Sequence, residues 1–146
     1  MTRAVILDTG PLGRVTHPKA QPEVTEWYQR CLEEGIQFVV PEIADYELRR
    51  ELVRADLKES IRRLDALGEA VRYAPLTTSV MRRATELWAR MRDEHTPTAD
   101  DKALDGDVIL AAQAEALAGD YGEVVIATEN VGHLDRMVPA RKWSDI

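Results

Sequence analysis

Asp8, Glu47 and Asp107 are the residues of this sequence that are best placed to do chemistry. Asp8 follows a short apolar run typical of a strand, whereas Glu47 and Asp107 lie in helical patterns next to two further strands. Ligands of open parallel sheets bind beyond the carboxyl ends of the strands, where such a fold would gather these side chains. Three carboxylates in one small pocket need a counter-charge, and Mg²⁺ or Mn²⁺ would supply it because hard cations prefer oxygen ligands. The arrangement predicts hydrolysis of a phosphodiester bond by a water that the cation activates.

Three polar residues are candidates for support of this site. Thr9 follows Asp8 directly, and Thr128 and Asn130 follow the last clear apolar strand. Side chains of these types hydrogen-bond to nearby backbone groups in turns, and here they would also contact water bound to the metal. We therefore expect them to give polar support to the metal site.

Asp105 is a second acid close to Asp107, and the start of its helix decides whether both can serve one site. In a continuous helix, residues two apart point about 200° away from each other. If Asp105 is the N-cap, Asp107 lies in the first turn, where the helix dipole favours a carboxylate, and both can face one cleft. The competing boundary is Thr98 as the cap with Asp101 three residues on, as in a capping box. We favour Asp107 as the main ligand and keep Asp105 as an additional one.

The spacing of apolar residues predicts an α/β fold, a doubly wound parallel sheet flanked by helices. Strands alternate with helices along the chain, no repeat or flexible linker divides it, and residues 1–146 are expected to form a single domain. The short run after residue 70 contains Pro75, which favours an edge strand. The predicted strands are 4–7, 36–40, 71–76 and 124–127; the predicted helices are 24–32, one from 42, 57–67 ending at Gly68, one from Thr77 or Thr78 to 91, and 104–117, with turns at 9–11 and a loop at 93–101.

Composition limits the classes of protein to which the chain can belong. Its 146 residues are 45% hydrophobic, enough for a core of ordinary size, and the formal net charge of −7 argues against coating nucleic acid through bulk charge. No apolar run approaches the roughly 18 residues of a membrane span, and the first one is too short for a signal peptide. The single cysteine, Cys31, cannot form an internal disulfide or a cysteine-based zinc site. We expect a cytoplasmic protein without a membrane partner.

A locally basic stretch offers a way to hold a nucleic acid despite the acidic total. Residues 49–63 hold six basic and three acidic side chains. Arg49, Arg50 and Arg54 are therefore candidates for contact with a phosphate backbone. An equally good interpretation is a solvated helix face laced with salt bridges, and Glu47 itself could pair with Arg50 one turn away.

Four segments together resemble the PIN domain family, which includes VapC-type toxin ribonucleases and nucleases that process ribosomal RNA. They are VILDTGPL around Asp8, VVPEIADYELRREL around Glu47, DVILAAQA from Asp107 and VVIATENVGHL near the end. The resemblance implies a metal site of three or four acids, cleavage of single-stranded RNA, a homodimer and, for toxins, an antitoxin protein as partner. Asp8, Glu47 and Asp107 match the first three acids of the family. The fourth position departs from the pattern, because the chain has Asn130 or His133 where members commonly carry aspartate, with Asp105 as a substitute.

Other classes of protein fit less well. Asp-Thr-Gly at residues 8–10 also occurs in aspartic proteases, but those need a second such carboxylate in a mostly β structure. A haloacid-dehalogenase-type phosphatase would need an aspartate where Gly10 stands, and a receiver-like domain would need paired acids near the first strand. The remaining alternative is a non-catalytic module that keeps the fold, lacks the fourth acid and only binds RNA or protein.

Overall fold

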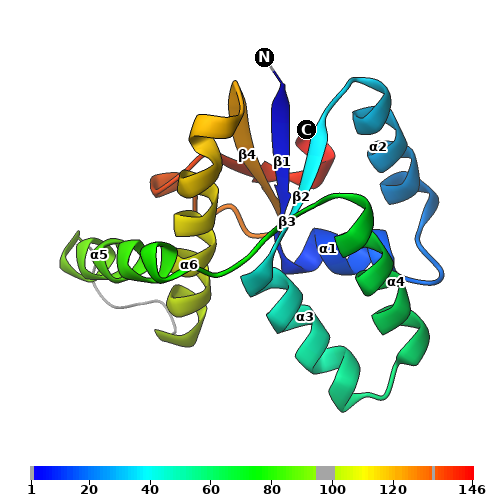
Figure 1. The fold of residues 1–146 in the computed structure, drawn as a ribbon, viewed down its shortest axis with the longest axis horizontal. Helices are drawn as coiled ribbons and strands as arrows, with labels where there is room; N and C mark the ends of the chain where they lie inside the picture. Colours follow the sequence, from blue (N-terminus) through cyan, green and yellow to red (C-terminus); the bar gives the residue numbers. More distant parts are fainter. Residues whose placement is uncertain (1, 95–100, 133) are drawn as a thin grey trace.

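The structure, a computed structural model that describes residues 2–94, 101–132 and 134–146, is built around a parallel sheet with the first strand at its centre (Figure 1). The strand order is β3-β2-β1-β4-β5, and every pairing is parallel. The predicted doubly wound α/β fold is confirmed. The strands are β1 (Arg3–Leu7), β2 (Gln37–Pro41), β3 (Arg72–Ala74), β4 (Glu123–Thr128) and β5 (Ala140–Lys142); the helices are α1 (Thr9–Thr16), α2 (Pro22–Glu33), α3 (Glu42–Arg54), α4 (Lys58–Ala70), α5 (Thr78–Glu94) and α6 (Asp101–Leu117).

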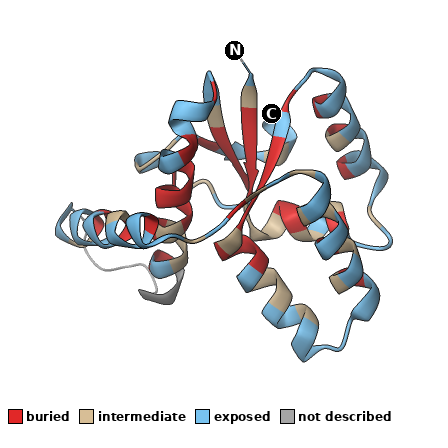
Figure 2. Cartoon of the chain, viewed as in Figure 1, coloured by how far each residue is buried: buried red, intermediate tan, exposed pale blue. Residues whose placement is uncertain are grey.

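Both faces of the sheet are buried under helices, which explains the continuous apolar runs in its central strands. Val5 and Leu7 of β1 pack into one core with α1, α2 and α4, whereas Ala4 and Ile6 pack into a second core with α6. The four residues are fully buried, and the buried part of the molecule follows the central strands and the inner helix faces (Figure 2). A third core joins α5 to α6.

The order of the strands creates a switch point at the centre of the sheet. From β1 the chain moves outward through β2 and β3 on one side, and then returns to place β4 and β5 on the other side. The carboxyl ends of β1 and β4 therefore lie side by side, with connections leaving in opposite directions, and Asp8 and Thr128 stand there. This is the position at which open α/β sheets bind ligands.

Several predicted boundaries were wrong for local reasons. Residues 9–11, predicted as a turn, begin helix α1, because Asp8 caps the helix by accepting a hydrogen bond from Thr9 N, and Pro11 lies in the first turn, where its missing N–H has no helical partner. Gly68 lies inside α4, which continues to Ala70. Strand β5 was not predicted at all. The predicted edge strand at 71–76 is confirmed as β3, which ends before Pro75.

The predicted loop at 93–101 is only partly within the described residues. Its first two residues belong to α5, residues 95–100 lie outside the described part, and Asp101 begins α6. None of the helices within the described residues combines the length and the apolar character that crossing a membrane requires.

Candidate functional site

Asp8 is held at the carboxyl end of β1 by hydrogen bonds to both of its carboxylate oxygens. Thr9 N donates to Oδ1 at 2.7 Å, and Thr128 Oγ1, at the end of β4, donates to Oδ2 at 2.8 Å. Thr128 is itself fully buried, and the backbone N–H of Asn130 donates to its hydroxyl oxygen at 3.0 Å. The Asp8 carboxylate is therefore fixed by the first turn of α1 and by the neighbouring strand.

Glu47 reaches the same place from α3 and touches both α1 and α6. Its Oε1 accepts a hydrogen bond from Thr9 Oγ1 at 3.1 Å, so Thr9 joins Asp8 to Glu47. Its Oε2 lies 2.9 Å from the point where a Cβ atom at position 106 would stand. Gly106 therefore gives Glu47 the room to approach α6 next to Asp107.

Asp107 completes the group of acids from α6. Burial first, and then the negative charges of Asp8 and Glu47, raise the pKa of this half-buried carboxyl from its ordinary value of 3.8 to about 6. The three acids thus lie close enough to repel one another, although they come from positions 8, 47 and 107 of the sequence.

Asp8 and Glu47 have raised pKa values as well. Burial is the main cause for both; hydrogen bonds from Thr128 and Thr9 oppose it at Asp8, and the hydrogen bond from Thr9 opposes it at Glu47. The charge of Asp8 also raises the pKa of Glu47, while Arg50, at 4.0 Å from Glu47, lowers it. The site therefore has a negative electrostatic potential, and a bound cation would offset the repulsion between its carboxylates.

The structure does not bring Asp105 to the other acids. Helix α6 begins at Asp101, so the predicted start with Asp105 as N-cap was wrong, and Thr98 lies outside the described residues. Asp105 is exposed and lines a pocket with Met81 and Trp88 of α5, on another face of the helix from Asp107.

The structure places a further acid, Glu129, near Asp8, and it is none of the three residues suggested for the fourth acidic position. His133 lies outside the described residues, and Asn130 contributes its backbone N–H to Thr128 while the residue is exposed. Glu129, which the sequence analysis overlooked, lies next to the site: its charge raises the pKa of Asp8, and its carboxylate lies 2.9 Å from where a Cβ of Gly10 would stand. Its position directly after Thr128 was the signal in the sequence that could have identified it.

Within the described part of the chain, no group of three or more His, Cys, Asp or Glu side chains has the arrangement of a ready-made metal site. Asp8 and Glu47 instead accept hydrogen bonds from hydroxyl and backbone donors of Thr9 and Thr128.

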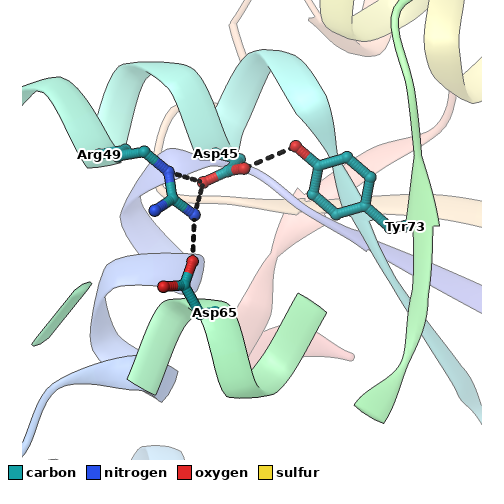
Figure 3. Close-up of polar contacts among 4 residues, drawn as sticks. All are labelled: Asp45, Arg49, Asp65 and Tyr73. Atoms are coloured by element: carbon teal, nitrogen blue, oxygen red, sulfur yellow. Dashed lines mark hydrogen bonds and ion pairs between the residues drawn. The ribbon is translucent and has the colours of Figure 1, made fainter. Parts of the chain in front are cut away.

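Arg49, Arg50 and Arg54, predicted to contact RNA, all lie near acidic side chains. Arg49 donates to Asp45 at 3.0 Å and to Asp65 of α4 at 2.7 Å, and Tyr73 of β3 donates to the other oxygen of Asp45 at 2.5 Å (Figure 3). Arg54 pairs with Glu51 at 2.6 Å, and Arg50 lies 4.0 Å from Glu47. This is the pattern of the salt-bridged alternative, and contact of these arginines with RNA stays a prediction.

The hydrogen bond from Tyr73 to buried Asp45 fastens α3 to β3, so its removal should lower stability. We expect Tyr73→Phe to reduce the free energy of unfolding by about 1.5 kcal/mol, or a Tm shift of about 4 °C, because an anionic acceptor loses its donor in a mostly buried place. Thermal unfolding measures the effect, with Tyr46→Phe as control, since Tyr46 is 56% exposed. Equal stability of both variants would contradict the role of the Tyr73 hydroxyl.

Comparison with known proteins identifies the fold. No protein-family profile matches the chain, and no curated protein matches it. Among solved structures, a chain of VapBC2 from Rickettsia felis bound to a DNA fragment from their promoter has a TM-score of 0.72 and 13% identity, over 96% of this chain and 98% of that chain. A chain of VapBC-1 from nontypeable Haemophilus influenzae has a TM-score of 0.65 and 18% identity, over 97% and 98% of the two chains. A chain of FitAcB from Neisseria gonorrhoeae has a TM-score of 0.63 and 19% identity, over 97% and 99%. The chain therefore has the PIN-like fold of VapC-type proteins, as its sequence motifs predicted.

Proposed function

We propose that this protein is a divalent-metal-dependent endoribonuclease that hydrolyses phosphodiester bonds of single-stranded RNA. The observation that carries the proposal is the convergence of Asp8, Glu47 and Asp107 at the switch point of the sheet, where their charges act on one another. Carboxylates that repel one another lower stability, so their gathering at a ligand-binding position favours a functional role, here the binding of a cation that acts on phosphates.

The donor set suits Mg²⁺ or Mn²⁺. Its donors are carboxylate and hydroxyl oxygens. Hard cations such as these prefer oxygen ligands. Asp8, Glu47 and Asp107 are the residues that would hold the cation, and the carboxylates would have to turn toward a common point, away from some of their present donors. When bound, the cation would polarise water and stabilise charge on the leaving oxygen.

The residues of the chain divide the remaining work. Thr9 and Thr128 hold Asp8 in one orientation, and Thr9 also holds Glu47. Asp107, whose raised pKa of about 6 lies near neutral pH, would orient the attacking water by accepting a hydrogen bond from it. Asn130 fixes the Thr128 hydroxyl through its backbone.

Cleavage of a labelled single-stranded RNA tests this function. We expect cleavage with Mg²⁺ or Mn²⁺, none in EDTA, and a loss of about 100-fold or more in Asp8→Asn, because that substitution removes the charge that organises the site. Asp105→Asn is the matched control, since it removes an acid from the same chain away from the cluster, and its activity should equal that of the wild type.

Two results would contradict the proposal. Equal cleavage by wild type and Asp8→Asn, or cleavage that survives EDTA, would exclude metal-dependent catalysis by this site. RNA binding without cleavage under all metal conditions would favour the alternative, a non-catalytic PIN-fold module.

A partner protein is part of the same proposal. The similar structures are named as VapBC and FitAB assemblies, some of them bound to DNA. We infer that this chain has the toxin role in such a pair, is inhibited by an antitoxin and forms a homodimer. Co-expression with the product of an adjacent small reading frame, followed by size-exclusion chromatography and a cleavage assay of the complex, tests this inference; an adjacent product that neither binds nor inhibits would contradict it.

A further inference from the structure

A pocket opens beside the acidic site, between α1 and the start of α2. Its volume is about 380 Å³, within the range of small-ligand sites. It adjoins the acids at two points, because Gly10 is two residues from Asp8 and Glu129 follows Thr128. The lining residues that matter for its chemistry are Gly10, Arg14, His17, Lys19, Gln21 and Glu129.

Hydrogen-bond donors dominate the polar lining of this pocket. Arg14, His17 and Lys19 are exposed residues, and Arg14 and His17 lie three residues apart on one side of α1 and its C-cap. Lys19 N donates to His17 Nδ1 at 2.9 Å, so the neutral ring carries its hydrogen on Nε2, which is then a donor. A guanidinium, an ammonium and an imidazole N–H around one hollow match the oxygens of a phosphate group.

One acid, Glu129, opposes this character. It forms an ion pair with Arg14 in which the side chains are 42% and 46% exposed. Ion pairs this exposed contribute little to stability, so a phosphate could replace Glu129 as the partner of Arg14. Glu129 lines the pocket, its carboxylate lies beside Gly10, and its charge raises the pKa of Asp8.

We propose that this pocket binds a phosphate of the RNA strand next to the bond that is cut, with Arg14 and Lys19 as its contacts and Glu129 as an internal competitor for Arg14. The proposal rests on the proposed function and assigns substrate binding to a different surface from residues 49–63. This pocket adjoins the acidic site through Gly10 and Glu129, whereas in that stretch Arg49 is held by two carboxylates, those of Asp45 and Asp65.

Binding of a fluorescent single-stranded RNA, measured by anisotropy in EDTA, tests the pocket without cleavage. We expect Arg14→Gln and Lys19→Gln each to weaken binding about 5-fold and to reduce the salt dependence by about one phosphate contact. Lys58→Gln is the control, because Lys58 is exposed in the other basic stretch and its loss removes the same charge. It should change affinity much less than Lys19→Gln.

Glu129→Gln gives the sharpest result, because the two interpretations of its ion pair predict opposite signs. If Glu129 competes with phosphate, the variant binds RNA more tightly, by about 3-fold, whereas a merely structural pair would weaken binding as Arg14→Gln does. Glu33→Gln, an exposed charge change on α2, corrects for the general effect of net charge. Thermal unfolding of each variant verifies that it is folded.

The outcomes separate this proposal from the proposed function. Weaker binding by the pocket variants supports the pocket even if wild type with metal leaves RNA uncut. Unchanged affinity and unchanged KM in Lys19→Gln would overturn the pocket even if wild type cleaves RNA. Binding of an acidic peptide in place of RNA would also overturn it.

Discussion

Asp107→Asn should make the metal-free protein more stable at neutral pH while it removes RNA cleavage. The folded protein raises the pKa of Asp107 to about 6 through burial and the charges of Asp8 and Glu47. The ionised form is therefore penalised in the folded state. Asparagine removes the charge and keeps the size, so we expect a gain of about 1 kcal/mol, reduced from the full linkage value because the carboxyl is only half-buried, and a Tm increase of about 3 °C.

The pH dependence of this gain follows from the direction of the pKa shift. Because the folded pKa lies above the unfolded value, protonation stabilises the folded wild type, fully below about pH 4, and this stabilisation is lost as the pH rises through about 6. The variant lacks this titration. Its advantage over wild type should be near zero at pH 4, grow between pH 4 and 6, and stay constant above.

Thermal unfolding in EDTA across this pH range measures the effect, and a parallel assay with Mn²⁺ measures cleavage, expected to fall about 100-fold or more. Asp105→Asn is the control, since Asp105 is exposed and lies on another face of α6. A variant less stable than wild type at pH 7, or a larger loss of cleavage in Asp105→Asn, would show that the wrong acid has been assigned to the site.

Gln113→Leu should give the largest loss of stability. Gln113 is 1% exposed, its Oε1 accepts from Ile43 N at the start of α3 at 3.2 Å, and its Nε2 donates to Ala74 O at the end of β3 at 2.7 Å. Leucine fills the space but leaves a buried N–H and a buried carbonyl without this partner. We expect a loss of about 3 kcal/mol and about 9 °C in Tm.

The same substitution should disturb the acids, because Gln113 ties α6, which carries Asp107, to α3, which carries Glu47. Chemical denaturation and thermal unfolding measure the stability, and Gln29→Leu on the exposed side of α2 is the control. A loss below about 1 kcal/mol, equal to that of the control, would mean that the neighbouring backbone groups find other partners.

The sequence was sufficient for the elements with a strong apolar pattern. Residues 4–7 and 124–127 are continuous apolar runs, as expected of strands that helices cover on both faces of the sheet. The order of strands and helices then predicted that Asp8 and Thr128 lie at the carboxyl ends of neighbouring strands. Helix α1 was hidden because Thr9, Gly10 and Pro11 individually favour a turn, whereas the capping bond from Thr9 N to Asp8 allows a helix to begin. Propensity is a weak guide where a cap and tertiary packing decide.

The convergence of the three acids was predictable from the sequence, but their contacts were not. Asp8, Glu47 and Asp107 follow from their positions relative to the strands, yet the bridging by Thr9 depends on the angle between α1 and α3. Glu129 escaped notice because an exposed acid after a strand is common, and only the fold shows that it lies beside Gly10 and Arg14. The pairing of Arg49 with Asp65 likewise requires the packing of α3 on α4.

The outermost strands of the sheet, β3 and β5, are only three residues long. Each edge of the sheet therefore presents few unpaired backbone N–H and C=O groups to another chain. Short edge strands of this kind protect a protein against the edge-to-edge strand pairing that leads to fibrils. The large exposed apolar side chains of the described residues lie instead on helices or directly beside them, among them Val53 of α3, Leu57 before α4 and Trp88 of α5.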